Sequence, residues 1–599
     1  MLSYLYNIRF GLLAITVVVS YLLWPFVQSA VKVDNSLTIW FLKDDPALKE
    51  YKLFHQKFGN DEMVVLVVKD EKTLLTKKHF TSFIAMTKAL ESMPEVQMVI
   101  GPGNADVVSK DILGLLSKPL ITDSSDPADV NADLESMPRL KEQLYNQNYT
   151  AARFLISFKS SKDFDNQRGV ILNKVRESIY KYLPSSNSYF GGVGIIYEGL
   201  NELSNADFGF FLGIGYLAMF VLLLWIYRKP VLLLYAISTI AISTYITIGI
   251  YGLAGLQLNL MTILIPAILI VLGIMDIMHI LNVYLEISDK NKSKKASTLL
   301  ALKQVFKPCL FTTLTTMAGF LSLMISPMPI LQQFGLFTAL GIFLCLVFTY
   351  VFGVIFMPVA SPSTITIFSA RNIVNQILAS VLKHKTVYTI VSAMVVIVSI
   401  TGMFFIKTDT YTLGYFPAKN KVVKDHEMIE KVWGPYMPLE LVVNVKDGKK
   451  LHDPAVVMGA IAFADSAQKI MGGGKIFGFH SFYQAALTAQ YGKKDQLMLK
   501  SRTSLQNIHD QLPFYYPDLY KGFVHEQSQT GRITLFGTMT SAKELDRKMD
   551  TILKIANNAF GNSAKISPSG YQPMYADIVA YVTNSQINSL TISAFSIFI

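Results

Sequence analysis

Charged residues are scarce in this chain: only 16% of its 599 residues are Asp, Glu, Lys or Arg, against about 25% in soluble proteins. The deficit comes from long apolar runs that alternate with stretches of ordinary composition. A wholly water-soluble fold is therefore excluded. The formal charge of +11 does not indicate nucleic-acid binding either, because the Lys and Arg residues flank the apolar runs instead of forming a basic motif.

Cysteine is almost absent, with two residues, Cys309 and Cys345, both inside apolar runs. A disulfide framework in the water-exposed segments is therefore excluded. The chain also lacks CxxC and HExxH metal-site spacings, and its Gly472–Gly474 triplet is not followed by the GK[ST] of a nucleotide-binding loop. We expect no metal, no bound cofactor and no enzymatic centre, so any work would draw on an ion gradient.

Seven apolar runs are long enough, at about 20 residues, to span a bilayer as helices. The first carries Trp24 and Pro25 where a signal peptide would be cleaved, so we expect it to be retained. An eighth run begins near residue 586 and reaches Ile599, which predicts a helix bundle whose second half is cut short. The seven runs cover residues 8–27, 207–227, 231–254, 259–283, 306–326, 331–358 and 386–406.

Basic residues predict the orientation of these helices, because cytoplasmic loops carry an excess of Lys and Arg. Such residues follow the second, fourth and sixth runs, for example Arg228 and Lys229, Lys290 and Lys292, and Arg371. The short loops Gly252–Leu258 and Ser326–Ile330 on the other side carry no charge. We expect a cytoplasmic N-terminus, two large outer segments at 28–206 and 407–584, and a cytoplasmic linker at 359–385. Residues 364–380 of this linker would form an amphipathic helix on the membrane surface.

Both outer segments show strand and helix patterns in the same βαβ…βαβ order, which predicts two α+β domains of the ferredoxin-like type. Asp34 and Asp409 lie 375 positions apart, and Gly194 and Gly570 lie 376 apart, which indicates a duplicated unit. The expected strands and helices lie at 63–68, 77–92, 96–100, 152–158, 164–183 and 188–193 in the first segment, and at 439–445, 453–469, 475–479, 532–540, 542–560 and 564–568 in the second.

Three stretches of the sequence resemble a known superfamily. The first runs from Asn35 through Trp40 and Asp44-Asp45-Pro46 to Phe58-Gly59-Asn60-Asp61-Glu62. It resembles the segment after the first helix of the resistance–nodulation–division (RND) superfamily, in its MmpL-like and hopanoid-exporter-like branch. The other two are Gly273-Ile-Met-Asp276-Ile-Met-His279 and Thr312-Thr313-Leu-Thr315-Thr316-Met-Ala-Gly319-Phe320.

The resemblance covers nearly the whole chain and implies a layout around a sterol-sensing-like unit of five helices at 207–358. Single helices at 1–27 and 386–406 would precede the outer domains, and residues 585–599 would begin a further helix. It implies an exporter of lipids or other hydrophobic molecules, driven by the proton gradient, in a bacterial inner membrane with periplasmic outer domains. Membrane lipids and the cargo would be its partners, and a homo-oligomer or a periplasmic partner stays open.

Two alternatives also stay open: a lipid sensor or scaffold that does not transport, and a protein-export accessory of the same superfamily. No substrate-binding residue is predicted.

Asp276 is the main candidate for chemistry. A carboxylate at the centre of a membrane helix costs roughly 2.5–3.5 kcal/mol, so it normally faces the bundle interior and has a partner or a function. His279, three residues further on, should lie on the same helical face. We expect Asp276 and His279 to couple to protons; the alternative is that they pair and only hold helices together. In the superfamily such an acid works with groups on the tenth helix, beyond Ile599.

Four further residues could support this acid. Thr312 and Thr316 lie one turn apart and could hydrogen-bond to it, although threonines in membrane helices often bond to their own backbone carbonyls. Gly273 and Gly319 would let neighbouring helices approach closely.

We expect the polar residues near the ends of the first outer segment to have structural roles rather than catalytic ones. We expect Asn60, Asp61 and Glu62 to form a turn before the strand at Met63, and Glu198 to line a cleft next to the membrane.

Overall fold

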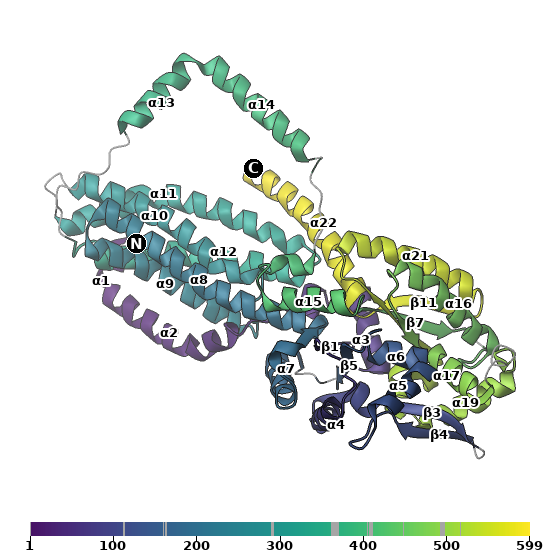
Figure 1. Ribbon diagram of the computed structural model, residues 1–599. Coiled ribbons are helices and arrows are strands. Elements are labelled where there is room, and N and C mark those ends of the chain that lie inside the picture. Colours follow the sequence, from purple (N-terminus) through teal and green to yellow (C-terminus); the bar gives the residue numbers. More distant parts are fainter. Residues whose placement is uncertain are drawn as a thin grey trace. The chain divides into compact units, whose positions relative to one another are not determined.

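The computed structural model divides into two compact units (Figure 1). The helical unit comprises Met1–Asn35, Glu202–Thr408 and Tyr581–Ile599, and the sheet unit comprises Ser36–Asn201 and Asp409–Ala580. The structure describes residues 2–111, 114–159, 161, 164–288, 293–360, 371–403, 405, 411–446, 448–491, 498–515 and 517–598. Lys290, Lys292, Asp409 and residues 364–370 of the expected amphipathic helix lie outside these ranges.

Seven helices of the described chain are long and apolar enough to cross a membrane, and each overlaps one of the predicted runs. The prediction of a multi-pass membrane protein is confirmed. These spans are α2 (Arg9–Ala30), α8 (Val193–Tyr227), α9 (Pro230–Leu253), Thr262–Ser288 with α10 (Ile265–Ser288), Lys294–Ile325 with α11 (Lys294–Leu321), α12 (Pro329–Phe356) and α14 (Lys385–Met403).

Two of the helices begin well before the apolar runs that predicted them. α8 begins at Val193 and α11 at Lys294, because their first turns contain charged residues that an apolar window does not capture. Gly194 therefore lies inside α8. The glycine that corresponds to Gly570 is Gly192, since both have positive φ, +110° and +81°, and both directly precede a long helix.

The core of the helical unit is built around α9 and α12, whose side chains are mostly buried. α9 packs against α2, α10 and α12, and α12 packs against α10 and α11; in Figure 1 these helices run side by side. Close helix approach depends on glycine: a Cβ at Gly335 would lie 2.4 Å from the Phe320 carbonyl oxygen. α14 differs from the others, since its side chains from Lys385 to Gly402 are exposed.

A long helix from the sheet unit also contributes to the helical unit. α22 (Tyr571–Phe598) contacts the segment between α11 and α12 through two serines. Ser326 Oγ lies 2.8 Å from Ser585 Oγ, and the Ser322 hydroxyl donates to the Ser589 carbonyl at 3.2 Å.

The first half of the sheet unit contains an antiparallel sheet in the order β2-β5-β1-β6. The strands that come first and third along the chain are central, and the second and fourth are at the edges. Helices α4 and α7 pack against each other and share one hydrophobic core with the sheet. The elements are α3 (Pro46–Phe58), β1 (Met63–Lys69), α4 (Lys77–Glu91), β2 (Val96–Ile100), β3 (Asp106–Asp111), β4 (Gly114–Pro119), α5 (Pro127–Ser136), α6 (Pro138–Leu144), β5 (Ala151–Phe158), α7 (Phe164–Tyr180) and β6 (Ser188–Gly191).

The second half repeats this order as β11-β7-β10-β8, with β9 added beside β10. Helices α16 and α21 again pack against each other over a separate hydrophobic core. The elements are α15 (Lys421–Val432), β7 (Met437–Val445), α16 (Pro454–Ile470), β8 (Ile476–Gly478), α17 (Phe479–Tyr491), α19 (Arg502–Tyr515), α20 (Pro517–Phe523), β9 (Val524–His525), β10 (Thr530–Gly537), α21 (Ala542–Phe560) and β11 (Ala564–Ser569).

The two halves exchange helices. α3 precedes the first sheet in the sequence but contacts β11 of the second, and α15 precedes the second sheet but contacts β6 of the first. Equivalent residues in the two halves lie 375 positions apart: Gly59 and Gly434 end the two helices with φ of +86° and +99°. The sheet unit is therefore one body with an internal repeat.

Candidate functional site

Asp276 lies near the middle of α10, and its side chain is buried, with 7% of the residue exposed. α10 packs against α9, α11 and α12, so the carboxyl group lies inside the bundle rather than on its outer surface.

Polar side chains from three helices surround the Asp276 carboxyl group. The Cys309 thiol and the Thr313 hydroxyl on α11 are within hydrogen-bonding reach of it. Cys345 and Tyr350 on α12 and Tyr235 on α9 lie within electrostatic range. No Lys, Arg or His of the described chain forms an ion pair with Asp276. The site therefore holds a carboxyl group among neutral polar groups.

The residues expected to assist Asp276 lie elsewhere. His279 is exposed and makes no hydrogen bond to Asp276 among the described contacts, although it lies within electrostatic range. Thr312 donates to the carbonyls of Pro308 and Cys309, and Thr316 donates to the Thr312 carbonyl. Bonding to their own helix is the alternative that the sequence left open for Thr312 and Thr316, and neither hydroxyl bonds to Asp276 among the described contacts.

Thr313, one residue from Thr312, occupies the position next to Asp276. It is buried, and its hydroxyl makes no hydrogen bond of regular geometry among the described residues. The sequence did not single out Thr313, because four threonines between positions 312 and 316 leave the buried face of α11 undefined.

The two glycines singled out in the sequence have different surroundings. A Cβ at Gly273 would lie 3.0 Å from Ile240 Cγ1 and 3.5 Å from Cys345 Sγ, so α10 passes close to both α9 and α12 at this point. Gly319 lies on α11, and its carbonyl accepts a hydrogen bond of 2.7 Å from Ser322 Oγ.

A row of buried hydroxyl groups on α9 was not predicted. Thr239, Ser243 and Thr247 each donate to the carbonyl four residues earlier, at 2.7–2.8 Å. Ser243 lies within hydrogen-bonding reach of Cys345, one of the groups around Asp276. The spacing of four residues in a helix places these hydroxyls on one face, and this is the sequence signal that could have identified them.

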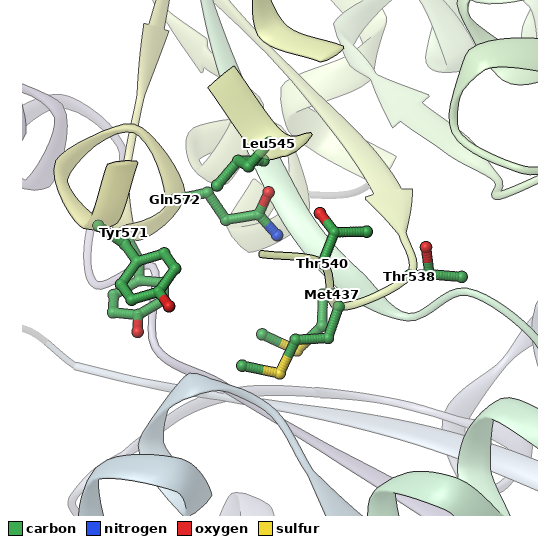
Figure 2. Close-up of a pocket in the computed structure, with 8 residues that line it drawn as sticks. Met437, Thr538, Thr540, Leu545, Tyr571 and Gln572 are labelled. Atoms are coloured by element: carbon green, nitrogen blue, oxygen red, sulfur yellow. The ribbon is translucent and has the colours of Figure 1, made fainter. Parts of the chain in front are cut away.

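A shallow pocket lies in the sheet unit where α22 begins (Figure 2). Its lining combines thioether, aromatic, hydroxyl and amide groups and contains no charged side chain. The lining residues are Met437, Thr538, Met539, Thr540, Leu545, Tyr571, Gln572 and Tyr575.

Next to this pocket, Asp61 joins the two halves of the sheet unit. Its carboxylate accepts a hydrogen bond of 2.9 Å from the Tyr571 N–H and lies 2.7 Å from His55 Nε2. Burial alone would raise the pKa of Asp61, but the hydrogen bond and charge of His55, with smaller contributions from Arg532 and Tyr51, hold it below the ordinary value of 3.8. The segment does lead into β1 as predicted, but Asp61 also fixes the start of α22.

The equivalent junction in the second half has a tyrosine in place of Asp61, and Asp425 of α15 accepts a hydrogen bond of 3.1 Å from the Phe190 N–H there. Tyr436, 375 positions after Asp61, lies against Gly191, where a Cβ would be 2.6 Å from Tyr436 Cε2. His426 Nδ1 lies 2.8 Å from the Tyr436 hydroxyl oxygen, and burial lowers the pKa of His426 to about 4. The imidazole is therefore neutral at physiological pH.

Three buried glutamates among the described residues of the sheet unit are paired with arginines. Glu62 pairs with Arg168, with 2.8 Å between Arg168 Nε and Glu62 Oε2. Glu198, which was expected to line a cleft, accepts from Arg176 at 2.7 Å and is buried. The third pair is Glu440 with Arg532.

Two histidines of the sheet unit lie close together. The ring centroids of His452 and His509, which lie 57 positions apart in the sequence, are 4.7 Å apart. Within the described ranges, however, no three His, Cys, Asp or Glu side chains are placed to hold a metal ion.

Comparison with known proteins supports the conclusion that this chain is a membrane protein. MJ1562 of Methanocaldococcus jannaschii, which is named only as a membrane protein, is 21% identical over 335 residues, covering 53% of this chain and 82% of that protein. The MMPL family model matches residues 43–377, more than half of the chain. This match confirms the predicted resemblance and suggests a transporter of the RND type rather than an enzyme. The chain belongs to the MMPL family.

Proposed function

We propose that this protein is a proton-driven exporter of lipids or other hydrophobic molecules in a bacterial inner membrane. Its N-terminus would be cytoplasmic, and the two halves of the sheet unit would be ferredoxin-like periplasmic domains that receive cargo. The observation that carries the proposal is Asp276, a carboxyl group buried in the helix bundle among neutral polar side chains.

The physical argument rests on what such a carboxyl group can do. A charged side chain inside a membrane is costly, so an acidic residue kept there normally serves a function such as proton relay. Each proton that crosses a potential of 100 mV supplies about 2.3 kcal/mol. Thr313 and Cys309 can bond to either protonation state, since a hydroxyl and a thiol both donate and accept.

Two continuous helices offer a route for transmitting this work. α8 and α22 each begin directly after a positive-φ glycine, Gly192 and Gly570, and each contributes to both units. A helix is stiff, so a shift of its part in the helical unit would be felt at its first turn, near which Asp61 or Gly191 lies.

The test compares Asp276→Asn with Glu286→Gln in the full-length protein. Glu286 is an exposed carboxylate on the same helix, so its replacement is a matched control. A strain lacking the protein is complemented with each variant, and envelope lipids are compared by mass spectrometry at equal protein levels. We expect Asp276→Asn to behave like the empty strain, Glu286→Gln to restore the lipid pattern, and Asp276→Glu to restore part of it.

Normal lipid export in the Asp276→Asn strain would refute proton coupling at this residue. If the lipid pattern does not depend on the protein at all, the sensor and the protein-export accessory remain; crosslinks from the sheet unit to a passing polypeptide would identify the accessory.

A further inference from the structure

Two arginines occupy equivalent places in the two sheets. Arg153 is the third residue of β5 and pairs with Val67 of β1, and Arg532 is the third residue of β10 and pairs with Val442 of β7. Both are buried, with 5% and 6% of each residue exposed.

Arg532 has a carboxylate partner. Its Nε lies 2.8 Å from Glu440 Oε2, and its Nη2 lies 2.6 Å from Glu440 Oε1. Thr534 also donates to this carboxylate at 2.7 Å. The buried charge of Arg532 is thereby neutralised.

Arg153 has no carboxylate partner among the residues that the structure describes. Glu440 lies two residues before Val442, and the residue two before Val67 is Val65, which is apolar. Arg153 Nε donates to the Gln143 carbonyl at 3.2 Å, and no described residue accepts a hydrogen bond from Nη1 or Nη2. Burial lowers the pKa of Arg153 to about 10, which leaves the guanidinium charged at neutral pH.

A second cation, Lys475, lies beside Arg153. Trp433 contacts both cations: its ring centroid is 4.7 Å from Arg153 Cζ and 5.3 Å from Lys475 Nζ. The Lys475 ammonium donates to the Glu142 backbone carbonyl. The one carboxylate near Lys475 in the described chain also belongs to Glu142; it lies 3.8 Å away and is 66% exposed. Burial first, and then the charge of Arg153, lower the pKa of Lys475 to about 8.

The cluster therefore has an excess of positive charge in a partly buried place. A buried cation without a counter-charge is unfavourable, and a cation–π contact compensates for only part of this cost. A tetrahedral oxyanion would satisfy both cations, because a guanidinium binds phosphate with two parallel hydrogen bonds and an ammonium adds a third.

We propose that Arg153 and Lys475, backed by Trp433, form a binding site for the phosphate group of a lipid headgroup. That the phosphate belongs to a lipid rests on the proposed function, whereas that the site binds a phosphate group rests on the two cations. The site would let the sheet unit select cargo by headgroup charge.

The test measures binding to the purified full-length protein by calorimetry with three probes. These are inorganic phosphate, dihexanoyl phosphatidic acid, and dihexanoylglycerol, which has the same chains without the phosphate. Arg153→Gln and Lys475→Gln should each weaken phosphatidic acid binding about 10-fold or more, since a hydrogen bond to a charged group is lost. Lys469→Gln, which removes an exposed lysine of the same half, should leave it unchanged.

A further variant blocks the site without removing a cation. Val65→Glu would give Arg153 the partner that Glu440 gives Arg532, so it should abolish phosphate binding. Thermal unfolding of each variant checks that the fold is intact. Arg153→Lys should keep part of the affinity.

Because Lys475 titrates, we expect the affinity for phosphatidic acid to depend on pH. The groups that face it are Arg153 from β5, Glu142 from α6 and the Trp433 ring. Lys475 loses its proton as the pH rises through about 8, so affinity for phosphatidic acid should fall between pH 7.5 and pH 9. The Lys475→Gln variant should lack this fall.

Binding of phosphatidic acid that depends on Arg153 and Lys475 supports the site, whether or not inorganic phosphate also binds. Binding of inorganic phosphate alone would assign the site to a free anion and overturn the lipid source. No binding of either phosphate, or equal binding of dihexanoylglycerol in all variants, overturns the proposal. None of these results bears on Asp276, because binding is measured without a proton gradient.

Discussion

Asp61 accepts a hydrogen bond from the backbone N–H of Tyr571, 510 positions later in the chain. A carboxylate at the first residue of a helix satisfies an N–H without an intrahelical partner and interacts favourably with the helix dipole. Gly570 leaves room for this contact, since a Cβ there would lie 2.9 Å from Asp61 Oδ2. A residue of the first half of the sheet unit thereby stabilises the start of the helix that follows the second half.

Asp61→Ala should therefore destabilise the sheet unit by about 1–3 kcal/mol, because the Tyr571 N–H and His55 both lose a buried partner. Denaturant unfolding of the purified protein, followed by the signal of the sheet unit, measures the change. Asp44→Ala is the control, since the Asp44 side chain is 97% exposed. Equal stability of the two variants would show that the contact contributes nothing.

The same carboxylate predicts acid sensitivity. The pKa of Asp61 is depressed in the folded protein, so its stabilising contribution is present above the ordinary value of 3.8 and is lost as the pH falls through the lower folded value. Asp61→Asn should lack this part of the acid destabilisation. Unfolding temperatures between pH 5 and pH 2.5 provide the measurement, and parallel curves for both proteins would contradict the assignment.

Breaking one buried ion pair should cost more than removing an unpaired arginine. Arg532→Met leaves the Glu440 carboxylate buried without its partner and should cost about 3–5 kcal/mol. The double variant Arg532→Met/Glu440→Leu should recover most of this loss, because no buried charge remains. Arg153→Met should cost less than Arg532→Met. A larger loss for Arg153→Met would mean that an acidic partner of Arg153 exists.

Gly335 is expected to be intolerant of any side chain. Gly335→Ala would place a Cβ 2.4 Å from the backbone carbonyl of Phe320, which cannot move aside as a side chain would. Gly209→Ala, at a helical glycine with nothing within 4 Å, is the matched control. Fluorescence-detected size-exclusion chromatography after heating should show a lower midpoint for Gly335→Ala only.

A disulfide should connect α22 to the rest of the helical unit. Ser326 Oγ and Ser585 Oγ lie 2.8 Å apart, which is close enough for Ser326→Cys/Ser585→Cys to form a bond. Mild oxidation in membranes should shift the mobility of this variant on a non-reducing gel. Each single cysteine variant is a control, and the native cysteines are buried. An unchanged mobility would contradict this packing of α22.

Features that depend on local composition could be predicted from the sequence. Asp276 was identified because a single carboxylate interrupts a long apolar run, and the strand order along the chain followed from alternating patterns. Which side of α11 faces the bundle interior could not be predicted, because the four threonines between positions 312 and 316 lie on several sides of the helix. Only the packed bundle selects Thr313.

Contacts between the two halves of the sheet unit could not be predicted from the sequence. Nothing near Asp61 indicates Tyr571, and the exchange of α3 and α15 is a property of tertiary packing. The repeat was predicted, but Gly194 was the wrong landmark; the conformation of Gly192, with φ of +110°, identifies the equivalent position.

The exchange of α3 and α15 between the two halves determines when the sheet unit can fold during synthesis. α3 contacts β11, whose last residue is Ser569, so the first half cannot adopt its native packing until more than 500 residues have left the ribosome. Until then the apolar face of α3 and the Asp61 carboxylate that follows it are exposed to solvent or bound by another protein. Segments exposed in this way are prone to aggregate. Premature termination anywhere before β11 should therefore yield a product that is degraded, not a smaller working domain.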